Sequence, residues 1–396
     1  MRFVADRPVT IEKAQYAERW FPFVFRTTEG ILLMYVEYGF DAHWAPFFRL
    51  ESHDNGRTWV NPTDNVPRLA WCHSFADGEL FEVDSYGVHD PKTPADAVYF
   101  GCWSYPGRRA QAPVKGFVRV RNSSNKKVCL TEMRGYPTHP WWNLWNTLHG
   151  TDALTGSEVF LNGPYFTGGV ELPDGRLLAA GYWTDAVLYE SRDRGHTWEE
   201  AAFINKTSAT GIEANETTLV RLDDGRLYVV CRTEPTQSNV HGGRLMHAWS
   251  SDLGKTWTPL EPVPLIDSDH QPRYAWPRLC KLSGGGLVLV YGRPGKHLVV
   301  DPSGTGSQWQ GRFDLHQWEL DTQALHGVPP ELRLRGIVGE DLAQRCDRHT
   351  DSGDYLGVVE TAPRELLVFY DVHAYVERWN ARPCSAVRMV RLRVEG

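Results

Sequence analysis

Carboxylates, arginines and tyrosines recur beside short apolar segments of this sequence, and together they suit chemistry on sugars. Paired carboxylates are typical of glycoside hydrolysis, in which one is the acid and the other a base or an aid to the nucleophile. A tyrosine beside a glutamate can pass its proton to the glutamate and attack an anionic sugar, where a carboxylate nucleophile would be repelled. Converging arginines bind carboxylate or sulfate because the planar guanidinium donates two parallel hydrogen bonds. This chemistry requires elements that bring the three residue types together.

A recurring eight-residue phrase identifies those elements. It occurs at Ser52–Trp59, Ser191–Trp198 and Ser250–Trp257, and each copy reads S-x-D-x-G-x-T-W. A weaker copy, Pro302–Trp309, keeps Gly306 and Trp309 and has Gly304 in place of the aspartate. The aspartate can accept bonds from nearby backbone N–H groups, the glycine supplies a positive φ, and the tryptophan packs under the turn. The phrase therefore predicts a β-hairpin turn, which is a fold element and not a catalytic site.

A second repeat, in which a tight turn joins two apolar strands, is interleaved with the first. Copies lie at 166–179 and 217–230, with looser ones at 21–35, 69–83, 276–291 and 355–370. Asp-Gly turns, such as the one at Asp174 and Gly175, are strong hairpin signals. The two repeats together give four strands per unit and six units. They predict an all-β fold, a six-bladed β-propeller with four-stranded antiparallel blades.

We expect a single domain over residues 1–396. Its blades are predicted near 19–65, 66–157, 158–210, 211–268, 269–345 and 346–396. The segment 1–15 is expected to add an outer strand to the last blade and so close the ring. The second blade is overlong and contains an aromatic loop whose Trp141, Trp142 and Trp145 could stack on sugar rings.

Composition excludes several partners. The formal net charge of −7 argues against nucleic acid or an anionic membrane. No apolar run is long enough to span a membrane, and the N-terminus lacks the apolar core of a signal peptide, which predicts a cytoplasmic protein, or a secreted one if a leader was removed. The seven cysteines are scattered, as expected of free thiols. Without a His/Cys cluster of ligand spacing we expect no metal and no cofactor, and a carbohydrate as the partner.

Propeller geometry predicts where the polar residues meet. The first strand of each blade lines the channel and the second runs antiparallel to it, so starts of first strands and ends of second strands share one rim. The positions on that rim are Arg19, Glu37, Asp41, His73, Asp84, Tyr86, Tyr165, Tyr182, Asp185, Glu213, Glu216, Arg232, Arg273, Arg278, Arg293, Asp354, Tyr355, Asp371 and His373. Any one of them could instead be a surface ion pair, a turn residue or part of the core. Their clustering on one rim favours function.

At this point the chain resembles the sialidase superfamily, because its phrases look like the Asp boxes of that family and six blades match its propeller. The resemblance covers nearly the whole chain and is strongest in the repeats. The segment Glu216–Leu222 looks like the one bearing the glutamate that activates the nucleophile. Val230–Thr233 looks like the next segment, which supplies a triad arginine through Arg232. Tyr355 sits where the nucleophilic tyrosine is expected, and Asp41 where the acid/base aspartate is expected.

The chain departs from this family at the start of blade 1. Sialidases carry an Arg-Ile-Pro phrase there, whereas this chain has Trp20–Pro22 with Arg19 one residue early. A shift by one residue points a strand side chain to the other face. Arg273 or Arg278 could supply another triad arginine, and Arg293 could substitute for the missing one.

The sequence thus predicts a sialidase-like exo-glycoside hydrolase acting on a terminal, acidic sugar. Asp41 would be the acid/base, Tyr355 the nucleophile and Glu216 its base. The residues predicted to bind substrate are Arg19, Arg232, Arg273, Arg293, Asp185 and Trp142.

Two alternatives stay open. A polysaccharide lyase acting on uronate-containing glycans would use His73, His373 and rim tyrosines. A catalytically inactive carbohydrate-binding propeller would fit the departure at Trp20. The sequence does not specify the sugar, its linkage, the stereochemical outcome of the reaction or the oligomeric state.

Overall fold

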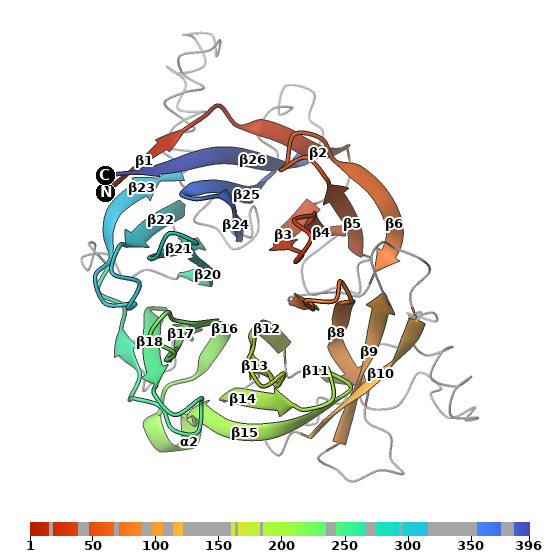
Figure 1. Cartoon of the computed structure of the whole chain (residues 1–396), viewed down its shortest axis with the longest axis vertical. Helices are drawn as coiled ribbons and strands as arrows, with labels where there is room; N and C mark the ends of the chain where they lie inside the picture. Colours follow the sequence, from red (N-terminus) through yellow and green to blue (C-terminus); the bar gives the residue numbers. More distant parts are fainter. Residues whose placement is uncertain are drawn as a thin grey trace.

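The structure, a computed structural model, describes residues 1–15, 19–38, 47–66, 71–88, 97–105, 114–121, 160–162, 165–182, 185–234, 243–265, 274–292, 295–315, 355–373 and 384–396. Strands are arranged as a ring around a common axis (Figure 1). The strands nearest the axis are β3 (Arg19–Arg26), β7 (Cys72–Ser74), β12 (Tyr165–Glu171), β16 (Ala214–Arg221), β20 (Ala275–Lys281) and β24 (Leu356–Ala362). The all-β propeller predicted from the repeats is confirmed.

Three of the sheets are separate four-stranded antiparallel blades, as predicted. The first contains β3 with β4 (Leu32–Tyr38), β5 (Phe47–Ser52) and β6 (Val60–Val66). Another contains β16 with β17 (Leu227–Thr233), β18 (Leu245–Ser250) and β19 (Glu261–Pro262). The third contains β20 with β21 (Leu287–Gly292), β22 (Lys296–Asp301) and β23 (Gln310–Asp314).

Six separate blades were predicted, but in the described residues the strands form five hydrogen-bonded sheets. The expected blades near 66–157 and 158–210 share one nine-stranded sheet. Its further strands are β8 (Leu80–Val88), β9 (Ala97–Tyr105), β10 (Val114–Arg121), β11 (Phe160–Asn162), β13 (Leu177–Tyr182), β14 (Ala186–Ser191) and β15 (Thr197–Asn205). The two halves join where Arg119 and Val120 of β10 pair in parallel with Thr197 and Trp198 of β15.

The last sheet joins the two ends of the chain. It has the order β1-β26-β25-β24, where β1 is Arg2–Ala5, β25 is Glu365–His373 and β26 is Cys384–Glu395. Arg2 lies opposite Glu395, and β2 (Val9–Gln15) also pairs with β26. The prediction that segment 1–15 adds outer strand structure to the last blade is therefore confirmed.

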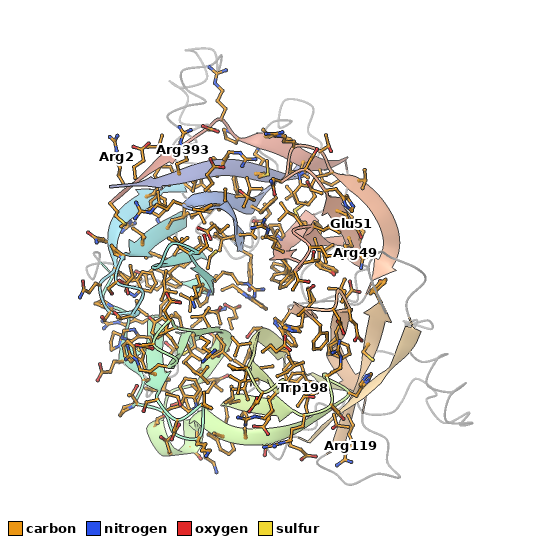
Figure 2. The ribbon with its side chains drawn as sticks, in the orientation of Figure 1. Arg2, Arg49, Glu51, Arg119, Trp198 and Arg393 are labelled. Atoms are coloured by element: carbon orange, nitrogen blue, oxygen red, sulfur yellow. The ribbon has the colours of Figure 1, made fainter. Side chains whose placement is uncertain are left out.

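The hydrophobic core is divided into clusters that lie between neighbouring blades. In one of them Leu178 and Leu188 pack with Leu227 and Val229 of the next blade. Figure 2 shows Trp198 inside the ring, whereas Arg2, Arg119 and Arg393 lie at its periphery. Burial of apolar area between blades is thus what holds the ring together. The described cysteines, Cys72, Cys102, Cys231 and Cys280, are free thiols. In the described part of the chain, no helix has the length and apolar character to cross a membrane.

Each S-x-D-x-G-x-T-W phrase forms the predicted turn. In the second copy the Ser191 hydroxyl accepts the N–H of Gly195 at 2.8 Å. The Asp193 carboxylate accepts both the N–H and the hydroxyl of Thr197, at 2.8 and 2.6 Å. The indole N–H of Trp198 donates to the Gly195 carbonyl at 2.8 Å. The turn is therefore satisfied by its own side chains, and the same bonds hold the copy at Ser250–Trp257.

The weak fourth copy replaces this chemistry with one carboxylate. Asp301, one residue before the aligned phrase, is fully buried and accepts the N–H of Gly306 at 2.6 Å and that of Ser307 at 3.1 Å. Its other oxygen accepts the hydroxyl of Ser303 at 2.6 Å. Asp301 thus takes the roles of both the serine and the aspartate, which explains why Gly304 can stand in the aspartate position.

The glycines of these turns lie against the preceding blade. A Cβ atom at Gly195, whose φ is +92°, would lie 2.6 Å from the ring of Phe81. A Cβ atom at Gly306 would lie 2.5 Å from the ring of Tyr228, and Gly254 and Gly56 are crowded in the same way by Leu188 and Leu367. The glycine is therefore required twice, for the positive φ and for the close approach of neighbouring blades.

Gly195→Ala should destabilise the protein more than Gly175→Ala, because both residues have positive φ but a Cβ at Gly175 meets nothing within 4 Å. We expect Gly175→Ala to lower the free energy of unfolding by about 1 kcal/mol for the backbone alone. Gly195→Ala should lower it by about 1–3 kcal/mol more, because Phe81 must move. Chemical denaturation of both variants measures the difference. Equal losses would show that the turn does not brace the neighbouring blade.

His247 gives the stability of the ring a specific pH dependence. It is 3% exposed, and its Nδ1 lies 2.9 Å from the Tyr228 hydroxyl. Burial lowers the pKa of His247 from 6.5 to about 4. In this range the unfolded chain binds a proton that the folded chain does not, so the contribution is fully present above pH 6.5 and is lost as pH falls toward 4.

Wild type should therefore lose up to about 3 kcal/mol more stability than His247→Gln between pH 6.5 and 4. Thermal unfolding of the two proteins across this range measures the difference. The matched control is His53→Gln, which replaces a histidine whose side chain is 52% exposed. Parallel curves for wild type and His247→Gln would contradict the assignment.

Candidate functional site

Near their first residues, three inner strands each contain a β-bulge with a non-glycine residue at positive φ. Phe21 on β3, Glu216 on β16 and Trp276 on β20 have positive φ angles of 54°, 44° and 27°. Each lies at a break in strand register, between Trp20 and Phe23, Asn215 and Thr218, and Ala275 and Arg278. Such β-bulges re-aim side chains, and a non-glycine residue in this conformation is strained. The strain is concentrated where the sequence predicted a site.

Glu216 and Tyr355 meet at this place although they lie 139 positions apart in the sequence. The hydroxyl of Tyr355, which immediately precedes β24, donates to Oε1 of Glu216 at 2.7 Å. The backbone N–H of Trp276 donates to Oε2 of Glu216 at 2.7 Å. Glu216 is 4% exposed and Tyr355 is 7% exposed. The bulge at Glu216 and the bulge at Trp276 thus fix the carboxylate against the tyrosine.

Arg232 completes the group from the neighbouring strand β17. Its Nη1 donates to Oε1 of Glu216 at 3.0 Å, and its Nη2 lies 2.7 Å from Oε1 of Glu234. The Asn215 amide donates to the same oxygen of Glu234 at 2.8 Å. Burial acts to lower the pKa of Arg232, but Glu216, Tyr355 and Glu234 together raise it above its ordinary value. Arg232 is therefore a firmly held cation beside Tyr355 and Glu216.

Aromatic rings surround Tyr355 and separate it from the channel beyond. The ring of Phe21 lies 4.2 Å from that of Tyr355, and the ring of Trp276 lies 5.2 Å from it. Phe23 packs on Trp276 at 5.2 Å. On the other side of this aromatic layer, which consists of Phe21, Phe23 and Trp276, the guanidinium of Arg278 lies over Phe23 and Trp276.

Arg278 is a half-buried cation with a backbone partner. Its Nη1 donates to the carbonyl of Thr167 at 2.7 Å. Burial, opposed by the nearby Glu216, Tyr182 and Cys72, lowers the pKa of Arg278 to about 9, so the guanidinium keeps its charge at pH 7. Glu216 and Glu234 are both paired with Arg232, whereas Arg278 contacts the Thr167 carbonyl. Among the described residues, no group of three or more His, Cys, Asp or Glu side chains could hold a metal ion.

The geometry suits proton transfer from Tyr355 to Glu216. The hydroxyl is already within hydrogen-bond reach of a carboxylate that can receive its proton, and Arg232 lies on the same carboxylate oxygen. A tyrosine that loses its proton to a neighbouring base becomes a nucleophile. Tyr355 and Glu216 therefore have the arrangement of an activated nucleophile and its base.

The structure brings together three of the predicted site residues, Glu216, Tyr355 and Arg232. Asp185 instead accepts the N–H of Thr207 at 2.8 Å, at the start of the short helix α2 (Thr207–Thr210). Arg19 begins β3 opposite Tyr38, and only its backbone is described. Asp41, Arg273, Arg293 and Trp142 lie outside the described residues, so their roles stay predictions.

Two corrections concern residues that the rim argument misplaced or missed. His73 lies on β7, which has only three residues, and it does not contact Tyr355 or Glu216 in the described part of the chain. Instead it lines a cavity farther along the channel and pairs with Glu171 at 3.1 Å. Trp276, whose N–H holds Glu216, was not predicted. A signal was available, since Trp276 precedes Pro277 just as Phe21 precedes Pro22 at the equivalent bulge.

Comparisons with known proteins agree with this architecture. Residues 142–333 match the family model described as a BNR repeat-like domain. No curated protein matches the sequence. Among solved structures, a protein of unknown function from Dyadobacter fermentans is 15% identical, covers 99% of each chain and has a TM-score of 0.59.

Two further structures are glycoside hydrolases by name. A variant of the NanB sialidase of Streptococcus pneumoniae is 14% identical over 96% of this chain and 68% of that one, with a TM-score of 0.55. The α-L-arabinanase of Penicillium chrysogenum in complex with arabinobiose is 14% identical over 96% and 98%, with a TM-score of 0.53. At such identities the likeness concerns the fold. The chain is a β-propeller that is similar in fold to these enzymes, and its middle part matches the BNR repeat-like domain.

A second buried Tyr-Glu-Arg group provides a comparison for the site. The Tyr35 hydroxyl donates to Oε1 of Glu82, and Arg49 Nη1 lies 2.5 Å from the same atom. Arg49 also lies 3.0 Å from Glu51. Burial raises the pKa of Glu82 against the lowering effect of Arg49. All three side chains are at most 1% exposed, so this group joins two blades and has no access to a substrate.

Replacing Arg49 or Arg278 by methionine should lower stability to very different extents. Arg49→Met leaves Glu82 buried without its cation and should lower the free energy of unfolding by about 3–5 kcal/mol. Arg278→Met removes a cation whose desolvation is not fully compensated, and should change stability by less than about 1 kcal/mol. Chemical denaturation of both variants tests this contrast. A larger loss for Arg278→Met than for Arg49→Met would overturn it.

Proposed function

We propose that this protein is an exo-acting glycoside hydrolase in which Tyr355 is the nucleophile and Glu216 its base. The observation that carries the proposal is the 2.7 Å hydrogen bond from the Tyr355 hydroxyl to Glu216, made at a strained bulge in a sialidase-like propeller. Strain of this kind is often found at functional sites. The names of the sialidase and the arabinanase among the similar folds support a hydrolase.

In the proposed first step, the phenolic oxygen of Tyr355 attacks the anomeric carbon while its proton passes to Glu216. The bond to the leaving group breaks, and the acid, for which Asp41 is the candidate, protonates the departing oxygen. In the second step water attacks the glycosyl-tyrosine and gives its proton to Asp41, and Glu216 returns the proton to Tyr355. Arg232, bonded to Glu216, stabilises the charge on that carboxylate until the proton arrives.

We propose a terminal, acidic sugar as the substrate. A neutral tyrosine can approach an anionic sugar without the repulsion that a carboxylate nucleophile would meet. Arg232 supplies one cation beside Tyr355, and Arg19, Arg273 and Arg293 are the candidates for the others. Asp185 and Trp142 remain candidates for contacts with the sugar ring. Because the similar folds include an arabinanase, a neutral pentose is the substrate class against which the proposal must be compared.

Tyr355→Phe should lower kcat/KM on the preferred aryl glycoside by at least about a hundredfold, because it removes the attacking oxygen and keeps the ring. The panel would contain neuraminic, deoxynonulosonic and uronic glycosides together with arabinosides. The control is Tyr189→Phe, which deletes the hydroxyl of another buried tyrosine, 1% exposed and packed on Phe166 away from Glu216. Its activity should equal that of wild type.

A fluorinated glycosyl donor that traps the covalent intermediate tests whether Tyr355 is the nucleophile. Wild type should gain the mass of the glycosyl group on the peptide containing Tyr355, and Tyr355→Phe should not. Turnover of an acidic glycoside that survives in Tyr355→Phe would sink the assignment of the nucleophile. Saturable binding of sugars without turnover in the wild type would favour the binding propeller instead, and an unsaturated product from a uronate glycan would favour the lyase.

A further inference from the structure

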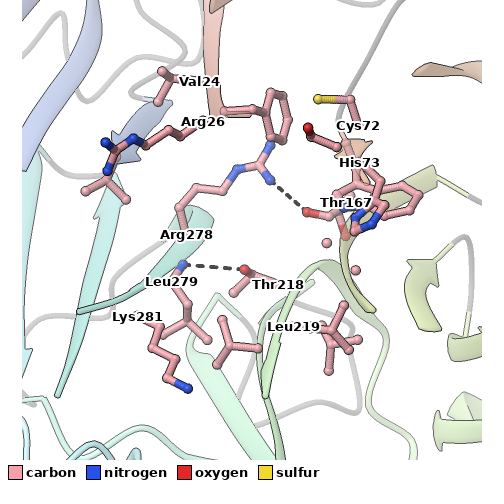
Figure 3. Close-up of a pocket in the computed structure, with 18 of the residues that line it drawn as sticks. Val24, Arg26, Cys72, His73, Thr167, Thr218, Leu219, Arg278, Leu279 and Lys281 are labelled. Atoms are coloured by element: carbon pink, nitrogen blue, oxygen red, sulfur yellow. Dashed lines mark hydrogen bonds between the residues drawn. The ribbon is translucent and has the colours of Figure 1, made fainter. Parts of the chain in front are cut away.

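The channel contains a cavity on the far side of the aromatic layer from Tyr355. Its volume is about 540 Å³, and its lining comes from the second halves of the inner strands β3, β12, β16 and β20, from β7 and from the start of β24 at Gly357 and Val358. Neither Tyr355, Glu216 nor Trp276 lines it. Arg278 does line the cavity (Figure 3), and its guanidinium also lies over the rings of Phe23 and Trp276 in the aromatic layer. The cavity is therefore separate from the proposed catalytic pair.

The charge of the cavity opposes that of the whole chain. Four lysine and arginine side chains line it, whereas Glu171 is its one Asp or Glu in the described residues, and Glu171 is engaged by His73 at 3.1 Å. The cations are Arg26, Arg221, Arg278 and Lys281. The chain as a whole carries a formal charge of −7. Low-dielectric walls strengthen the field of such a one-signed lining.

The arginines differ in how they are engaged. Figure 3 shows Arg278 reaching across the cavity to Thr167, while the head groups of Arg26 and Lys281 lie at its margin. Arg26 donates to the carbonyl of Glu360, and Lys281 pairs with Asp223 at its exposed end. The Nε of Arg221 is buried and has no hydrogen-bond partner in the part of the chain that the structure describes. A half-buried guanidinium with an unpartnered donor favours an anionic acceptor.

The apolar part of the cavity lining indicates what kind of molecule carries the anionic group. Trp71, Leu33, Leu80 and Leu219 provide an apolar surface, and the volume falls within the range of pockets for small organic ligands. An inorganic ion alone would leave most of this space unfilled. Arginines are suited to both carboxylate and phosphate, because the guanidinium fork matches either group.

We propose that this cavity binds a small organic oxyanion, a monosaccharide-sized molecule carrying a carboxylate or a phosphate, with Arg221 and Arg278 on the anionic group. The site is distinct from that of Tyr355 and Glu216 and holds its ligand on the opposite side of the aromatic layer. Its anionic group would accept hydrogen bonds from these two guanidinium groups. The proposal does not depend on the glycosidase activity.

Isothermal titration calorimetry on the whole chain tests the proposal with glucuronate, a glucose phosphate, inorganic phosphate and glucose. One of the two organic anions should give saturable heat, and whichever binds identifies carboxylate or phosphate as the preferred group. Inorganic phosphate should bind more weakly and glucose should not bind. Arg221→Gln should weaken binding at least about tenfold, which corresponds to about 1.4 kcal/mol. Arg278→Met should weaken binding of the organic anion to a similar extent. This second variant tests the site if Arg221→Gln does not fold.

Two controls locate the bound anion. Arg226→Gln changes an arginine of the adjacent turn that pairs with Asp224 and does not line the cavity, so its affinity should equal that of wild type. Tyr355→Phe should also retain the affinity. The proposal would be overturned by the absence of binding of either organic anion up to about 10 mM. It would equally be overturned by equal losses in Arg221→Gln and Arg226→Gln, or by loss of binding in Tyr355→Phe, which would place the anion at the catalytic pair.

Discussion

Close contact between each Asp-box glycine and the preceding blade is the constraint on which the rest of this structure depends. The serine and aspartate of the phrase satisfy the turn internally, and the glycine lets the turn rest on Phe81, Leu188, Tyr228 or Leu367 of the neighbouring blade. The clusters of apolar side chains between blades follow from that spacing. Pairing of β1 and β2 with β26 then joins the two ends of the chain in one sheet.

A fixed ring can hold strained residues at its axis. The bulges at Phe21, Glu216 and Trp276 each place a non-glycine residue at positive φ, which the surrounding sheet must enforce. These bulges orient the groups of the site: one directs the Glu216 carboxylate toward Tyr355, and another directs the Trp276 N–H toward Glu216. Three blades separated in sequence thus supply one hydrogen-bonded group.

Buried charge divides the channel into two regions. Near Tyr355 the carboxylates of Glu216 and Glu234 are paired with Arg232, whereas the lining of the cavity beyond the aromatic layer has an excess of cations in the described residues. The group of Tyr35, Glu82 and Arg49 shows the same side chains used only to join blades, because they are wholly buried. The same chemistry therefore acts as structure or as a site according to what can reach it.

The sequence by itself determined the repeated elements of this protein. The spacing of the S-x-D-x-G-x-T-W phrases and the Asp-Gly turns is local, because each turn is satisfied by bonds among neighbouring residues, and so the propeller and its strand units could be predicted. Resemblance to a known family singled out Glu216, Arg232 and Tyr355, but the contact of Glu216 with Tyr355 across 139 positions is a result of the tertiary structure. The tertiary structure alone decided what depends on packing between distant strands. It joined two predicted blades through β10 and β15, turned Asp185 to α2, placed His73 away from the rim and recruited the Trp276 N–H. A bulge shifts register by one residue, and no local pattern states which neighbour its side chain will then face.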